Sequence, residues 1–192
     1  MIREITEEDL GSHPALVCAH PDDECLWAGG LLARFRHLPW TVLCCSTPRI
    51  DPIRAQRFLK ACEMLGAQWA LNATIEGEPG QPIPGLDEML RGALDSYAPD
   101  CVVTHGVFGE YGHNQHVQVH HAVLDAFPGR VLGFGWHKGG QGALSLTLTD
   151  AELALKDAAL DCYGIKAAAL RKRYYKELRV PEDRESYDIY RE

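Results

Sequence analysis

Short apolar runs alternate with segments of helical periodicity along most of the chain, and this alternation restricts the fold more than any other feature. The expected strands are 15–19, 41–46, 68–73, 101–104, 131–136 and 145–148. The expected helices are 24–35, 53–65, 86–97, 114–127 and 151–178, the last with a break near Gly164. Such alternation predicts an α/β fold with a mainly parallel sheet covered on both faces. A length of 192 residues fits a single domain over 1–192.

A polar cluster, His20-Pro21-Asp22-Asp23-Glu24, follows the first expected strand and begins a helix. In parallel sheets, ligands bind at the carboxyl ends of the strands, so this position favours a functional site. His20 and Asp23 are three residues apart, and one turn can direct both at the same point. An alternative is a helix start whose acids complement the helix dipole. That alternative explains the acids but leaves His20 without a role.

A second cluster, His113-Asn114-Gln115-His116, follows the expected strand 101–104 through a glycine-bearing loop at 106–112. Its two histidines lie three apart, on one face of a starting helix. Exposed helix histidines are the alternative interpretation. Two histidines and one carboxylate are a common ligand set of catalytic zinc, with an open position for water. Together the two clusters therefore favour a metal centre.

The first cluster resembles the His-Pro-Asp-Asp-Glu box of the LmbE-like, or PIG-L, family of zinc-dependent N-deacetylases. The stretch 109–116, Gly-Glu-Tyr-Gly-His-Asn-Gln-His, is similar to the second motif of that family. The resemblance covers roughly residues 15 to 125. It implies a Rossmann-like three-layer sandwich with the active site at the carboxyl ends of the strands.

The resemblance also implies a role for each matching residue. His20, Asp23 and His116 would hold one Zn²⁺ per chain, with Fe²⁺ or Co²⁺ as alternatives. Asp22 would be the general base. His113 would stabilise the oxyanion or protonate the leaving amine. The residues expected to contact the substrate are Arg54 and Tyr111.

The activity implied is the hydrolysis of an N-acetyl group from an amino sugar or its conjugate, which releases acetate and a free amine. A thiol-conjugate amidase of the same family and a metal-binding protein without catalysis are the alternatives. Gln115 departs from the family, which often carries an acid there, and this change is expected to lower the pKa of His113. A dinucleotide-binding module is disfavoured because no G-x-G-x-x-G follows the first strand.

Composition narrows the class of partner. The net charge of −8 disfavours a nucleic-acid backbone as a ligand. No apolar run approaches the roughly 18 residues of a membrane span, and seven cysteines without a C-x-x-C pair suit a reducing compartment. We therefore expect a cytoplasmic protein with no nucleic-acid or membrane partner, and the resemblance implies a small-molecule amino-sugar substrate. The oligomeric state stays open, with a homo-oligomer as one option.

Overall fold

The computed structural model describes residues 2–46, 53–72, 81–137, 141–164 and 166–192. Its strands are β1 (Arg3–Glu4), β2 (Pro14–Cys18), β3 (Thr41–Cys44), β4 (Trp69–Asn72), β5 (Cys101–Thr104), β6 (Arg130–Phe134), β7 (Leu144–Thr147) and β8 (Arg184–Arg191). They form one sheet in the order β1-β7-β8-β6-β5-β2-β3-β4. Every pairing is parallel except those of β8, which runs antiparallel to both β6 and β7. The expected α/β fold is confirmed.

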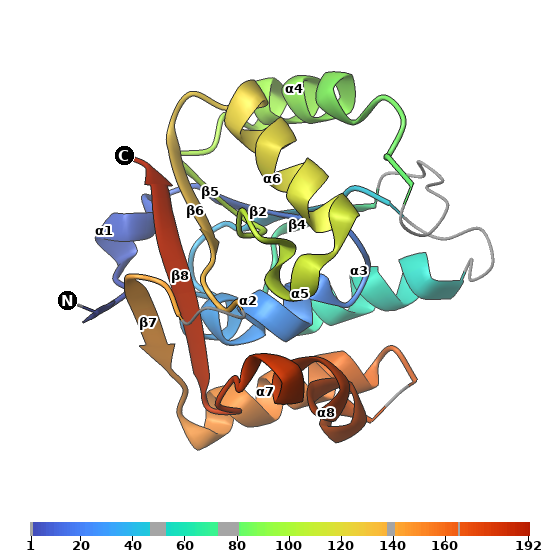
Figure 1. The fold of residues 1–192 in the computed structure, drawn as a ribbon, viewed down its shortest axis with the longest axis vertical. Coiled ribbons are helices and arrows are strands. Elements are labelled where there is room, and N and C mark those ends of the chain that lie inside the picture. Colours follow the sequence, from blue (N-terminus) through green and yellow to red (C-terminus); the bar gives the residue numbers. More distant parts are fainter. Residues whose placement is uncertain (1, 47–52, 73–80, 138–140, 165) are drawn as a thin grey trace.

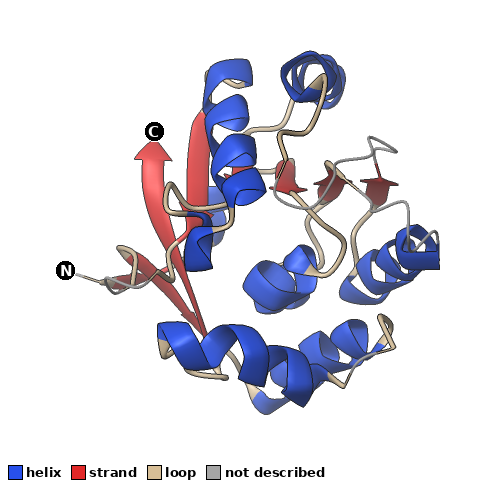
Figure 2. Cartoon of the chain, turned by 45° about the vertical axis from the view of Figure 1, so that its right-hand side comes forward, coloured by secondary structure: helices blue, strands red, loops and turns tan. Residues whose placement is uncertain are grey.

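Helices connect the strands and cover the sheet (Figures 1 and 2). They are α1 (Glu7–Leu10), α2 (Asp23–Arg34), α3 (Ile53–Leu65), α4 (Leu86–Tyr97), α5 (Gly109–Gly112), α6 (Asn114–Ala126), α7 (Asp150–Asp161) and α8 (Ala167–Leu178). The expected break near Gly164 is present, because α7 and α8 are separate helices. None of the described helices has the length and hydropathy needed to cross a bilayer.

Both faces of the sheet are buried, and β2 shows why its sequence is apolar without alternation. Leu16 and Cys18 belong to the core on the side of α2 and α3. Ala15 and Val17 belong to the core on the side of α4 and α6. Successive side chains of a strand point to opposite faces, so a strand buried on both sides carries apolar residues at every position.

The helices α7 and α8 add to the expected three layers. α7 packs against α2 and α3, so the C-terminal pair lies beyond α2, on its far side from the sheet (Figure 2). Two buried charges hold this contact: Lys156 Nζ donates to Glu185 Oε1 of β8 at 2.6 Å. The same Glu185 oxygen accepts a hydrogen bond from Gly30 N in α2. This arrangement leaves the carboxyl ends of the strands bordered by α2, α5, α6 and α8.

The order of the strands places β2 beside β5 at the centre of the sheet. From β2 the chain moves outward through β3 and β4, and then returns to β5 on the other side. Loops that leave two neighbouring strands in opposite directions open a crevice between them. The first polar cluster follows β2 and the second lies beyond β5, so both border this crevice.

An ion pair at the start of α7 gives a testable contribution to stability. Thr149 and Glu152 form a capping box, and Arg34 Nη2 donates to Glu152 Oε2 at 2.8 Å. The hydrogen bond from Arg34 lowers the pKa of Glu152 from 4.5 to about 2. Glu152→Gln keeps a capping residue but removes the charge. We expect it to lower the free energy of unfolding by about 1 kcal/mol at pH 7.

The sign of the pH dependence follows from the lowered pKa. The ion pair stabilises the fold above the ordinary pKa of a glutamate, and the stabilisation is lost as the pH falls from 4.5 toward 2. Urea unfolding at pH 7 and at pH 3 measures the difference between Glu152→Gln and the parent. Exposed Glu63→Gln, on α3, serves as the control. An equal difference at both pH values would contradict the assignment.

Candidate active site

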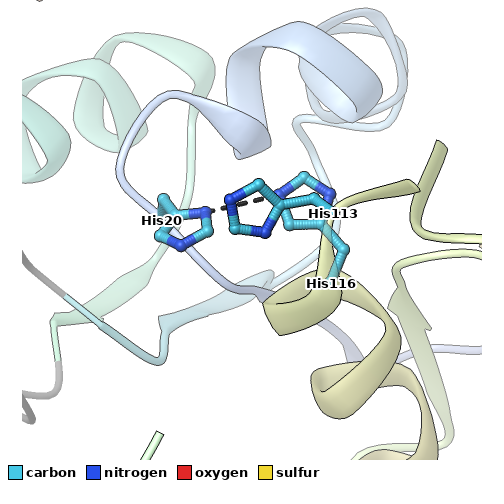
Figure 3. A group of neighbouring side chains, drawn as sticks. All are labelled: His20, His113 and His116. Carbon is cyan, nitrogen blue, oxygen red and sulfur yellow. Dashed lines mark hydrogen bonds between the residues drawn. The ribbon is translucent and has the colours of Figure 1, made fainter. Parts of the chain in front are cut away.

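Three donor atoms from the two clusters converge at the crevice. His20 Nδ1 lies 3.4 Å from Asp23 Oδ2, His116 Nε2 lies 3.4 Å from the same oxygen, and the two nitrogens are 3.3 Å apart. Figure 3 marks the contact between His20 and His116 with a dashed line and shows the His113 ring beside both. Tetrahedral coordination at about 2.0–2.1 Å separates ligand atoms by about 3.3–3.4 Å. The triangle therefore has the dimensions of three ligands of a tetrahedral zinc site, and His113 brings a further nitrogen within 4.8 Å of His20 and His116.

Hydrogen bonds on the outer side of each histidine fix its tautomer. His116 Nδ1 faces Glu110 Oε2 at 2.5 Å, and His20 Nε2 faces Gln115 Oε1 at 2.7 Å. Each of these oxygens can only accept, so the ring nitrogen opposite carries the proton. His116 Nε2 and His20 Nδ1 then present lone pairs to each other and to a carboxylate. The two nitrogen lone pairs and the carboxylate oxygen repel one another unless a cation lies between them, so this arrangement suits a metal ion.

Glu110 is a functional candidate that sequence reasoning left without a role. Its Oε2 accepts from both His116 and His105 Nδ1, the latter at 2.9 Å, and its Oε1 accepts from Gly106 N at 2.9 Å. Burial raises the pKa of this carboxyl, but the facing His105 and His116 outweigh burial and lower it to about 2. Glu110 has a φ of 53° inside the short helix α5, where the sequence predicted only a loop. The buried Glu110 carboxylate therefore orients the candidate ligand His116 through the ring nitrogen that faces away from the metal site.

His105 offers a second way to complete a metal site. Asp23, His105 and His116 also bring ligand atoms within 4.8 Å of one another. The His105 ring stacks on His116 with a centroid distance of 3.9 Å. However, His105 Nε2 accepts a hydrogen bond from Ala19 N at 2.9 Å, so its lone pair is already engaged. The geometry thus favours His20 over His105 as the third ligand.

The role of Glu110 leads to a prediction about metal affinity. Removal of a hydrogen-bonding partner of a ligating histidine typically weakens metal binding about 10- to 100-fold. Glu110→Gln is expected to raise the zinc dissociation constant by that factor, because a neutral amide polarises His116 less. Competition with a chromophoric chelator measures the constant. Glu88→Gln on the exposed side of α4 is the matched control, and an unchanged constant in Glu110→Gln would refute the role.

Asp22 lies beside the triangle in a strained conformation. Its φ is 109°, in the region that few non-glycine residues adopt, and its N–H donates to Glu24 Oε2 at 3.0 Å. Arg54 Nη2 donates to Asp22 Oδ2 at 2.7 Å. Burial raises the pKa of Asp22, Arg54 lowers it, and Asp23 and Glu24 raise it again, with the result at about 7. A carboxylate with such a pKa can exchange a proton near neutral pH.

Glu24 explains how that strained turn is held. The side chain is fully buried, and Glu24 Oε1 accepts a hydrogen bond from the Tyr163 hydroxyl at 2.5 Å. Burial raises the pKa of Glu24 to about 7. The helix-start interpretation of the first cluster is therefore correct for Glu24, which binds the backbone of Asp22. Asp22 and Asp23 themselves point elsewhere, toward Arg54 and the histidines.

The remaining residues expected at the site also lie there. The His113 ring is 4.6 Å from that of His116 and 4.8 Å from that of His20. Burial, with His116 and His20 nearby, lowers the pKa of His113 to about 4. The expected effect of Gln115 stays a prediction: its side-chain amide contacts His20, and burial is the first cause of the low pKa of His113. His113 Nδ1 accepts from Gln115 N at 3.3 Å, which leaves Nε2 as the protonated nitrogen.

Tyr111 contacts the histidines of the site, and Arg54 contacts Asp22. The Tyr111 ring lies 5.3 Å from the His116 ring and 5.8 Å from the His113 ring. Arg54 is held by Asp22, so its first partner is the candidate base. The structure thus gathers all seven predicted site residues at one edge of the sheet.

Fold and site together place the chain among α/β proteins with a candidate metal centre at the carboxyl edge of the sheet. Residues 15–127 match the PIG-L family, described as GlcNAc-PI de-N-acetylase. Because this match spans more than half of the chain, the chain belongs to the PIG-L family. The family and the N-deacetylase class expected from the sequence are confirmed.

Individual relatives agree with this assignment. A 1D-myo-inositol 2-acetamido-2-deoxy-alpha-D-glucopyranoside deacetylase from Corynebacterium diphtheriae is 25% identical over 84% of this chain and 75% of its own length. The chain spans about half the length of two further curated relatives with that activity.

Solved structures share the fold. An N,N′-diacetylchitobiose deacetylase from Pyrococcus horikoshii has a TM-score of 0.71 and 15% identity, over 95% of this chain and 85% of that one. A 4-carboxy-2-hydroxymuconate hydratase from Pseudomonas putida KT2440 has a TM-score of 0.66 and 16% identity, over 94% and 96%. At such identities the likeness shows the fold alone. Because the fold also supports a hydratase, the reaction has to be argued from the site.

Proposed function

We propose that this chain is a zinc-dependent deacetylase that removes the N-acetyl group from an amino-sugar conjugate. The observation that carries the proposal is the triangle of His20, Asp23 and His116 with Asp22 beside it. The curated relatives are named for the deacetylation of an N-acetylated glucosaminyl inositol. A structural neighbour is named for the deacetylation of diacetylchitobiose. Amino-sugar conjugates are therefore the substrate class to test first.

The donor set supports zinc within a metal-dependent family. Two imidazole nitrogens and one carboxylate oxygen suit Zn²⁺, and they also accept Fe²⁺ or Co²⁺. Zinc at His20, Asp23 and His116 would polarise the amide carbonyl and lower the pKa of an attacking water. A single such ion per chain is proposed, since His105 is engaged by the backbone.

The side chains around the triangle divide the proton transfers between them. Asp22, with a pKa of about 7, accepts the proton of the attacking water while Arg54 holds its carboxylate in place. His113 stays neutral and donates from Nε2 to the carbonyl oxygen as negative charge develops on it. Asp22 then returns its proton to the sugar nitrogen, and acetate and the free amine leave. The low pKa of His113 favours hydrogen-bond donation over the role of an acid.

A panel assay tests the proposal. Metal-loaded protein is incubated with N-acetylated amino sugars, their glycosides and an N-acetyl thiol conjugate, with and without a chelator, and release of primary amine is measured. Chelator-sensitive release from the sugars supports the deacetylase, and release from the thiol conjugate alone indicates the amidase alternative. No release, with about one metal ion per chain confirmed, would overturn the proposal in favour of a non-catalytic metal protein or a hydratase.

A further inference from the structure

The helix α8 brings an aromatic side chain and a cation to the active site from outside the region that defines the family. The family match ends at residue 127, whereas α8 covers Ala167–Leu178. α8 packs against α5, the short helix that carries Tyr111 and Glu110. α8 therefore lies outside the residues that the family model matches.

A continuous run of ring contacts leads from the metal triangle to the surface along α8. The His116 ring lies 5.3 Å from Tyr111, and the Tyr111 ring lies 5.2 Å from Tyr174. The Arg173 guanidinium lies 5.2 Å from the centroid of the Tyr174 ring. His116 is fully buried, Tyr111 and Tyr174 are half-buried, and Arg173 is exposed. The run thus extends outward from the reacting centre toward solvent.

The outer end of the run carries a positive charge for which the described part of the chain supplies no carboxylate partner. Among the described residues, no acidic group lies within ion-pair distance of Arg173. The chain as a whole is acidic, with a net charge of −8. Burial raises the pKa of Tyr174, Asp22 and Asp23 raise it further, and Arg173 and Arg54 lower it. The Arg173 guanidinium adds a local attraction for negative charge at the outer end of the run.

We propose that Tyr174 and Arg173 form a subsite for the part of the substrate attached to the amino sugar, with Tyr174 stacking on a ring and Arg173 binding an anionic substituent on it. This inference rests on the proposed deacetylase function. The acetyl group is small and must lie at the metal triangle, so the rest of the conjugate has to extend away from it. Aromatic side chains offer the flat apolar surface on which a ring packs, and arginine pairs with carboxylate or phosphate. The subsite therefore selects conjugates that carry a ring and a negative charge.

Three synthetic substrates separate these two contributions. They are the methyl, phenyl and 4-carboxyphenyl glycosides of N-acetylglucosamine, which share the scissile amide and differ stepwise by a ring and a charge. In Tyr174→Ala the ratio of kcat/KM for the phenyl over the methyl glycoside should fall about 3- to 10-fold. In Arg173→Gln the ratio for the 4-carboxyphenyl over the phenyl glycoside should fall about 2- to 5-fold, and less at high salt.

Two further variants guard against a purely structural effect. Tyr174→Phe keeps the ring and should keep the phenyl-to-methyl ratio of the parent. Lys172→Gln removes a neighbouring charge that faces a cavity shared with Lys176 and Arg179, away from the site, and should leave both ratios unchanged. Ratios that stay constant in Tyr174→Ala and Arg173→Gln would overturn the subsite.

Failure of the proposed subsite can be distinguished from failure of the proposed deacetylase activity. If none of the three glycosides releases amine, the proposed function fails, and calorimetric binding of the glycosides to Asp22→Asn protein tests the subsite alone. The subsite is supported if binding strengthens from the methyl to the phenyl to the 4-carboxyphenyl glycoside. Tyr174→Ala should then abolish the gain from the phenyl ring, and Arg173→Gln should abolish the gain from the carboxylate. Equal binding of all three overturns it.

Discussion

Asp22→Asn is expected to lower kcat about 10²- to 10⁴-fold, the usual contribution of a general base. The substitution suits the site unusually well. Asn is among the few residues that tolerate a positive φ, so the strained turn at 109° is retained, and its side-chain oxygen still accepts from Arg54. The variant therefore removes the ability to take a proton and little else.

Metal content separates this effect from damage to the metal site. Asp22 contributes no atom to the triangle of His20, Asp23 and His116, so Asp22→Asn should bind as much zinc as the parent. Initial rates of amine release, normalised to zinc measured by atomic absorption, give the comparison. Asp95→Asn, at an exposed position on α4, is the control for the same chemical change. A rate within threefold of the parent, or a loss of zinc, would remove Asp22 from the role of base.

Much of the fold was predictable because burial on both faces leaves a simple signature. Strands such as β2 and β5 are apolar throughout, and helices α3 and α4 begin and end where their apolar spacing and the stop at Gly66 indicated. β8 was missed because charged residues interrupt its pattern. Glu185 is acceptable in a buried strand because Lys156, 29 residues earlier in the chain, and the backbone N–H groups of Gly30 and Leu31 donate to its carboxylate. A contact of that kind is set by tertiary structure, and no local pattern reveals it.

The candidate site also has one part that the sequence predicted and another part that only the tertiary structure reveals. Short spacings, three residues in each cluster, were enough to predict that His20 and Asp23, and likewise His113 and His116, act together. The supporting residues were not predictable. His105 and Glu110 acquire their importance from a shared carboxylate oxygen, and Glu110 reaches it through a positive φ. Gly109 and Gly112 indicated an unusual turn, but they did not predict the direction of the Glu110 carboxylate.

Arg54 lies at the candidate site, as predicted, but its observed partner is Asp22. The sequence suggested contact with the substrate, and the structure places the guanidinium against the candidate base. The two roles are compatible, since a base held by one side of a guanidinium leaves other N–H groups free to bind a ligand. Its first effect on the chemistry is nevertheless on Asp22, whose pKa it lowers against the effect of burial.

The second large effect is expected from removal of the ligands one at a time. His20→Ala and His116→Ala should each weaken zinc binding on the order of 10³-fold or more, because each leaves two protein ligands for an ion that needs three. His105→Ala should weaken it far less, by about 10- to 100-fold, because His105 acts through Glu110 and its own Nε2 is engaged by Ala19. Equilibrium dialysis against buffered zinc measures the three constants.

The series decides whether His20 or His105 joins Asp23 and His116 as the third ligand. If Asp23, His105 and His116 held the ion, the order of His20→Ala and His105→Ala would be reversed. The two histidines also differ in solvent exposure. His105 is fully buried, whereas the His20 side chain is 15% exposed. An ion held by His20 can keep its open position accessible to a substrate, and one held by His105 would lie deeper. Greater loss in His20→Ala than in His105→Ala is therefore the result that a catalytic site requires.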